Sequence, residues 1–211
     1  MSDRDEVFAI SASNAPSVGL ERVARLISDL LCPAVVAIPG LVLGVWYSGV
    51  AATYGYALLY FAVAIPLPVG YLVWLLKTGR ATDFHLPDRR QRYGTFAVTS
   101  VAGMGGISLL AYLGAPTPFL AFLIVAMVET LLLFVITFAW QISIHAATVA
   151  GLATFAFWVL GGAAIVLTPL VPVVMWSRVY LRRHTLAQVI AGGALGCAAF
   201  GTLFMVRGVL W

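Results

Sequence analysis

Charged side chains are scarce in this sequence. Only 9% of its 211 residues are Asp, Glu, Lys or Arg, whereas 62% are hydrophobic. A typical soluble domain carries about 25% charged residues. The chain instead contains several apolar runs of about 20 residues, and each is long enough to cross a bilayer as a helix. The sequence therefore predicts an integral membrane protein and excludes an ordinary soluble domain.

Three further patterns are missing. The alternating segments of about ten residues that mark an outer-membrane barrel do not occur, so backbone hydrogen bonds must be satisfied within helices. Cys32 and Cys197, the two cysteines, suggest neither a disulfide framework nor a metal site. The acidic start lacks the basic-then-apolar order of a cleaved signal peptide. We expect an all-α, polytopic transmembrane helical bundle, with a polar tail over 1–19 and a single domain over 20–211.

The apolar runs predict about seven spans, or six. An amphipathic helix over 20–31 is expected to lie at the membrane interface and to lead into the first span. Pro66 and Pro68 predict a kink in the second span. The stretch 146–176 is too long for one helix, so we divide it at Gly161-Gly162 into two short helices. After a first span ending near 48, the expected spans are 52–76, 95–114, 117–140, 143–160, 162–180 and 185–208.

Three polar stretches separate these runs, namely 77–94, 141–145 and 177–184. Two spans lie between each stretch and the next, so all three are expected on one side of the membrane with the N-terminus. Of the twelve Lys and Arg residues, Arg207 alone would face the other side. Because positive residues are retained on the cytoplasmic side, we expect the three stretches to face the cytoplasm.

The third polar stretch carries an unusual set of side chains for a connecting loop. Arg178 is followed after five residues by His184, and Gln188 lies four residues further on. A guanidinium group matches the oxygens of phosphate, and the start of a helix adds backbone donors for an anion. His145 stands at the start of another apolar helix, so one histidine could attack phosphorus while the other protonates the leaving oxygen. Gln188 would lie on the same helix face as His184 and could accept a hydrogen bond from the imidazole.

The order of these residues resembles the type 2 phosphatidic acid phosphatase / haloperoxidase superfamily. Its third motif is Ser-Arg, five residues, His, three residues and Asp, and here SRVYLRRHTLAQ over 177–188 is similar with Gln in place of Asp. Its second motif, Pro-Ser-Gly-His, is matched at Ser143 and His145 but not at Ile142 and Ile144. Its first motif, Lys, six residues, Arg-Pro, is absent. TDFHLPDRRQR over 82–92 instead resembles the loop of a divergent prokaryotic branch.

This resemblance implies roles for particular residues. His184 would be the nucleophile that forms a phosphohistidine, His145 the general acid, and Gln188 would orient His184. The phosphate would be bound by Arg178, Ser143, Arg89 and Arg92. No metal or other cofactor is expected. The substrate would be a lipid phosphate in a prokaryotic cell membrane, either an isoprenyl phosphate or diphosphate or a phosphatidic acid.

Other readings of the same sequence stay open. The departures at Ile144 and Gln188 are compatible with a non-catalytic lipid-binding or assembly subunit of a membrane complex, with a membrane protein partner or a second copy of the chain. Glu129 lies in the middle of an apolar run, where a carboxyl group is costly and usually functional. The motifs give Glu129 no role, and structural pairing, a partner contact or a small-solute transporter are alternatives. We expect contact with the lipid bilayer and none with nucleic acid.

Overall fold

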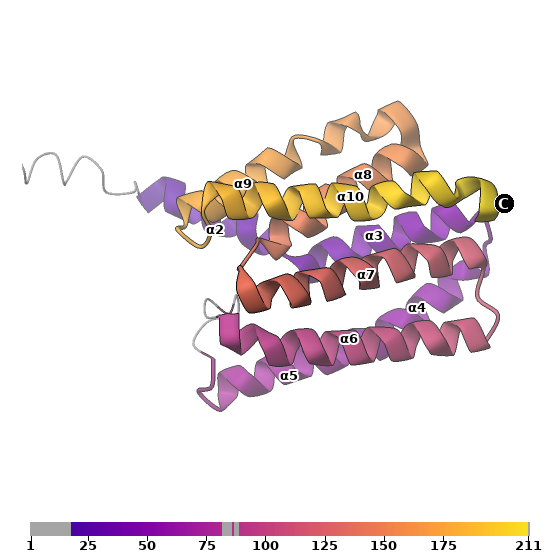
Figure 1. Cartoon of the computed structure of the whole chain (residues 1–211), viewed down its shortest axis with the longest axis horizontal. Coiled ribbons are helices and arrows are strands. Elements are labelled where there is room, and N and C mark those ends of the chain that lie inside the picture. Colours follow the sequence, from indigo (N-terminus) through magenta and orange to yellow (C-terminus); the bar gives the residue numbers. More distant parts are fainter. Residues whose placement is uncertain (1–17, 82–85, 87–88, 211) are drawn as a thin grey trace, which may run out of the picture.

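The computed structural model describes residues 18–81, 86 and 89–210, and for 89 and 206–210 it describes the backbone only. All regular elements in this part of the chain are helices, which confirms the predicted all-α bundle (Figure 1). The polar tail expected over 1–19 falls almost entirely outside the described residues. The elements in chain order are α2 (Val18–Leu30), α3 (Pro33–Ser48), α4 (Thr53–Ala64), α5 (Pro66–Lys77), α6 (Arg89–Tyr112), α7 (Thr117–Ala139), α8 (Ile144–Leu160), the 3₁₀ helix η1 (Gly161–Leu167), α9 (Leu170–Tyr180) and α10 (Leu186–Leu210).

Proline and glycine explain where several helices begin and end. Pro33 opens α3, where a missing N–H costs nothing. Pro66 opens α5 directly after α4, which gives the expected break in the second span. Gly49, at φ +67°, ends α3 in the left-handed region, where glycine has no steric penalty. The apolar runs are therefore divided by residues that cannot continue a helix.

The structure agrees with the lower of the two predicted span counts, six rather than seven. Within the described residues, five segments are long and apolar enough to cross a membrane: 53–77, 90–112, 117–139, 144–167 and 186–205. The pair α2 and α3, bent by 44°, makes a sixth if it counts as one span. The difference arises at 162–180, which we expected to be one short helix. It is divided into η1 and the 11-residue α9, and neither is long enough alone.

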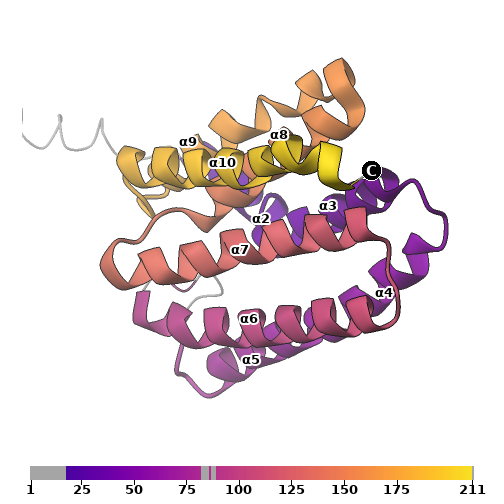
Figure 2. The same ribbon diagram turned by 45° about the vertical axis from the view of Figure 1, so that its right-hand side comes forward.

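The predicted polar stretches nevertheless lie at one end of the bundle. The chain runs away from this end along α8 and returns along η1 and α9, so α10 starts beside the start of α8 (Figure 1). The start of α6 and the helix α2 lie at the same end in both views (Figures 1 and 2). We call this the polar end. It gathers the segments that carry Arg92, His145 and His184.

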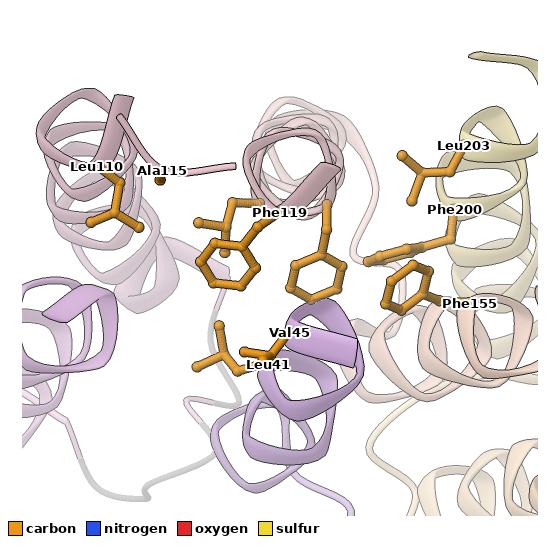
Figure 3. Close-up of a cluster of buried hydrophobic side chains, with 10 residues drawn as sticks. Leu41, Val45, Leu110, Ala115, Phe119, Phe155, Phe200 and Leu203 are labelled. Carbon is orange, nitrogen blue, oxygen red and sulfur yellow. The ribbon is translucent and has the colours of Figure 1, made fainter. Parts of the chain in front are cut away.

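The main hydrophobic core lies away from the polar end and joins α3, α7, α8 and α10. The rings of Phe122 and Phe155 stack with centroids 4.8 Å apart, and Phe119 and Phe155 are fully buried. In Figure 3 Phe155 and Phe200 point toward one another from α8 and α10, with Phe119 across from them on α7. Burying aromatic rings this large contributes strongly to packing. The core therefore fixes the helices on which the polar end is built.

Candidate functional site

The start of α8 places two of the predicted residues. Ser143 is the N-cap, and its hydroxyl oxygen accepts a hydrogen bond from the Ala146 N–H at 3.3 Å. Serine is favoured here because its oxygen satisfies a donor that the helix leaves open. His145 follows within the first turn and is 8% exposed. The hydroxyl of Ser143, which is fully buried, thus has a structural role as an acceptor.

The turn between α9 and α10 places Arg178 and His184. Arg178 lies in the last turn of α9 and is 1% exposed. Its carbonyl accepts hydrogen bonds from the N–H groups of Arg183 at 3.0 Å and His184 at 3.3 Å. These bonds fold the chain back at once, and Arg182 takes a left-handed conformation with φ 53°. The five residues between Arg178 and His184 therefore form a compact turn that keeps both side chains buried.

Two glycines bring the starts of α8 and α10 into contact. A side chain at Gly192 would collide with the backbone carbonyl of Ser143, and one at Gly196 would collide with that of Ala147. Small residues with this spacing allow close approach of membrane helices. The Ser143 N–H also donates to the Gln188 carbonyl at 3.1 Å. The second and third predicted motifs are thus joined directly through the backbone.

The helix α2 contributes a residue that the sequence analysis missed. Ser28 is 1% exposed, and its hydroxyl oxygen accepts a hydrogen bond of 2.6 Å from Arg178 Nη1. The face of α2 that packs on the protein consists of Ala24 and Ser28, one helical turn apart. Leu20, by contrast, is 49% exposed. A serine aligned with a small residue on an otherwise apolar stripe was the available signal.

His184 lies in a strongly positive and water-poor environment. Burial lowers the pKa of His184 to about 4, and the positive charges of Arg178 and Arg92 act in the same direction. Hydrogen bonds from the imidazole to the Gln188 side chain and to the Gln141 backbone oppose this shift. Nδ1 of His184 is buried and has no hydrogen-bond partner among the described residues. At neutral pH the imidazole is therefore uncharged and keeps a lone pair.

Arg92 is the second buried arginine of the polar end. It is 5% exposed, and its Nε donates to the Leu86 carbonyl at 2.7 Å. This bond ties α6 to the preceding loop, where Leu86 adopts φ 45°. Since Arg92 also acts electrostatically on His184, the predicted arginines of two separate stretches converge on one histidine. The side chain of Arg89 and the loop residue His85 lie outside the described residues.

Gln188 has a contact with Thr185 in addition to the predicted one with His184. The side-chain oxygen of Gln188 accepts a hydrogen bond from the backbone N–H of Thr185 at 2.9 Å. The backbone N–H of Gln188 donates to the hydroxyl oxygen of Thr185 at 3.3 Å. This reciprocal pair is the capping box that starts a helix. The Gln188 side chain also forms a hydrogen bond with the His184 imidazole, because its carbonyl oxygen has two lone pairs. Gln188 therefore fixes the backbone on which His184 stands.

A cavity of about 390 Å³ extends from the polar end into the bundle. Arg92 and His145 line it together with apolar side chains from α3, α5, α6, α7 and α8. Ile144, which stands where the resemblance would place glycine, also lines the cavity. The aromatic core closes the far part, where Phe155 and Phe200 contribute to the wall. The cavity has the size and mainly apolar lining of a ligand pocket.

Glu129 is in the cavity wall but not at the polar end. It is 5% exposed, and its Oε1 lies 3.6 Å from the position that a Cβ on Gly151 would occupy. Gly151 is six residues beyond His145 along α8. The carboxyl group of Glu129 therefore lies about 9 Å further from the polar end than His145, measured along the helix axis. In the described part of the chain, no three His, Cys, Asp or Glu side chains come together in the way that a metal site requires. Glu129 therefore belongs to the intramembrane part of the cavity.

The fold and the polar end define a class of protein: a multi-pass helical membrane protein with buried arginines and histidines gathered at one end. No family model, curated protein or solved structure matches the chain.

Proposed function

We propose that this protein is an integral membrane phosphatase that acts on a lipid phosphate through a phosphohistidine. The main support is the convergence of Arg92 and Arg178 on a buried, uncharged His184, with His145 at the adjoining helix start. The chain also resembles the type 2 phosphatidic acid phosphatase / haloperoxidase superfamily at these positions. Two positive charges can stabilise a transferring phosphoryl group, and two imidazoles can serve as nucleophile and general acid.

The chemistry would proceed in two steps. The lone pair of His184 attacks phosphorus, a P–N bond forms, and the P–O bond to the lipid breaks as His145 donates a proton to the leaving oxygen. Arg92 and Arg178 hold the nonbridging oxygens, where negative charge develops. Water then gives a proton to His145 and attacks phosphorus, inorganic phosphate is released, and the electron pair of the P–N bond returns to His184. A neutral imidazole is required at the start, and the environment of His184 favours that form.

The lipid would enter from the side rather than from water. The phosphate would lie at the polar end, and the lipid chain would occupy the cavity that Arg92 and His145 line. We place the polar end on the cytoplasmic side, because nearly all Lys and Arg residues are assigned to it. Such an arrangement keeps the charged head near the interface and the hydrocarbon within the protein.

A non-catalytic lipid-binding subunit is the second candidate. It is favoured by the hydrogen bond from Thr185 N–H to the Gln188 oxygen, since a carboxylate that stabilises the imidazolium is absent at this position. Ile144 also brings an apolar side chain into the cavity wall beside His145. In this alternative the same arginines hold a lipid phosphate without turnover.

Phosphate release in mixed micelles without added metal separates the two candidates. The panel contains phosphatidic acid, an isoprenyl monophosphate and an isoprenyl diphosphate. The phosphatase predicts release that His184→Ala abolishes and that Arg182→Gln retains, because Arg182 is exposed in the same turn. Binding of these lipids without release by the folded wild-type protein would favour the subunit.

A further inference from the structure

The deep part of the cavity contains polar groups that a purely hydrocarbon ligand would leave unsatisfied. Oε1 of Glu129 and the hydroxyl oxygen of Thr95 are buried, and neither has a hydrogen-bond partner among the described residues. Both residues line the same cavity. A buried polar group without a partner costs free energy, and a carboxyl group costs more than a hydroxyl. Two such groups facing one cavity indicate an occupant that carries polar atoms of its own.

The two groups lie at different depths below the polar end. Thr95 follows Arg92 by three residues on α6, which corresponds to about 4.5 Å along the helix axis. Glu129 lies at the level of Gly151, about 9 Å beyond His145 on α8. The polar groups thus form a series from the arginine at the interface to the carboxyl group inside the membrane. An extended ligand with a phosphate at the polar end would pass both.

The cavity opens on the flank of the bundle that faces lipid. Its lining includes Ala34 on α3 and Val69 on α5, which are both exposed. In Figures 1 and 2 α5 runs beside α6, whereas α3 runs beside α7 and α8. The opening between α3 and α5 is therefore bordered by apolar side chains. An amphiphile can enter from the bilayer without its chain crossing water.

From these observations we infer that the cavity binds a lipid whose chain carries a hydroxyl or amide N–H group, and that Glu129 accepts the hydrogen bond from it. A carboxyl group has acceptor oxygens in either protonation state. The donor on the ligand would lie about 9 Å from its phosphate, at the depth of Glu129. Isoprenyl chains and the acyl esters of phosphatidic acid have no such donor, so the inferred ligand is a lipid phosphate of a third class. This inference rests on the proposed function for the head-group end and adds a specificity-determining residue to it.

Binding of phosphonates tests the inference without turnover, because their P–C bond resists hydrolysis. The probes are hexadecylphosphonate and three analogues with one hydroxyl group, placed next to the phosphonate, about 9 Å below it, or near the chain end. Affinity is measured by competition against a fluorescent alkylphosphonate on the purified full-length protein. We expect the middle hydroxyl to tighten binding about tenfold and the other two to add less.

Two substitutions at Glu129 form the matched pair. Glu129→Gln keeps an acceptor oxygen and should retain most of the preference for the middle hydroxyl. Glu129→Leu removes the acceptor and should abolish the preference while hexadecylphosphonate itself still binds. If either variant fails to fold, the comparison of the four probes on the wild-type protein still decides the question.

Two results would overturn the inference, and they differ in what they say about the proposed function. Equal affinity for all four phosphonates would show that Glu129 is satisfied by water or protein, and the phosphate site at the polar end would stand. Failure of every phosphonate to bind would contradict the phosphate site as well. A preference that Glu129→Leu leaves unchanged would assign the donor contact to another residue and refute the role of Glu129.

Discussion

Removing the hydroxyl group of Ser28 should weaken both the fold and the binding of phosphate. Ser28 accepts a hydrogen bond of 2.6 Å from Arg178 Nη1, and both residues are almost completely buried. A hydrogen bond to a charged group contributes about 1.5–3 kcal/mol. In Ser28→Ala the guanidinium loses this acceptor within the protein. We expect the free energy of unfolding to fall by about 2 kcal/mol.

The same substitution should raise KM for the lipid phosphate by about tenfold, because each 1.4 kcal/mol of lost binding corresponds to that factor. Because Arg178 also holds the nonbridging oxygens as negative charge develops on them, kcat should fall as well. Unfolding is followed by intrinsic tryptophan fluorescence in denaturant, and KM by phosphate release. Ser28→Thr retains a hydroxyl group and should recover most of both losses.

Ser177→Ala is the matched control for this experiment. Ser177 is also fully buried and precedes Arg178, but its hydroxyl donates to the Val174 carbonyl of its own helix at 3.0 Å. Removing it should cost less, since a helical carbonyl already has a backbone partner. Equal effects of Ser28→Ala and Ser177→Ala on stability and on KM would refute the role of α2 in holding Arg178.

Three further predictions concern other parts of the molecule. The His184 imidazole should titrate near pH 4. The titration is followed by NMR of histidine-labelled protein, and the signal is assigned with His184→Gln. A midpoint near 6.5 would contradict the burial of His184 beside two arginines. Because the folded protein then binds fewer protons, this histidine should make the free energy of unfolding rise with pH between about 4 and 6.5. Gly196→Ala should destabilise the protein by about 1–3 kcal/mol in a denaturant titration. Gly201→Ala should not, because a methyl group at Gly201 would meet open space. Equal effects of the two substitutions would argue against close packing of α8 and α10. The orientation is tested in a variant without the native cysteines. In intact cells, Arg182→Cys should be protected from an impermeant thiol reagent, whereas Val50→Cys should react. The reverse pattern would invert the proposed orientation.

Much of the fold could be predicted from the sequence because membrane helices are long, apolar and bounded by polar or helix-breaking residues. The break before Pro66 and the ends of α7 followed from these signals. The division of 162–180 was missed, although Thr168 and Pro169, which lie between the 3₁₀ segment and α9, are a signal for a helix boundary. Hydropathy measures only how apolar a run is, and the path of the backbone within it depends on tertiary packing.

The candidate site shows the same division between local and distant signals. The spacing of Arg178 and His184 indicated that they act together, and the turn between α9 and α10 places them so. Ser28 is 150 residues away from Arg178 in the chain, so its alignment with Ala24 could mark a buried face of α2 but not the arginine that packs there. Gln188 was expected to contact His184, and its second use in the capping box with Thr185 was not foreseen. Sequence patterns thus predicted which residues gather, and not which atoms they use.

The most direct test of the central claim is to trap the phosphoryl group during turnover and locate it. The purified protein is mixed with a lipid phosphate that is labelled in the phosphoryl group. The reaction is quenched in alkali, because phosphohistidine survives there, and the peptides are analysed by mass spectrometry. The account predicts a phosphorylated His184 in the wild-type protein and no phosphorylated peptide in His184→Ala. The phosphorylated form should accumulate when release of phosphate is slowed. Turnover without any phosphorylated histidine, or a label that persists in His184→Ala, would contradict it.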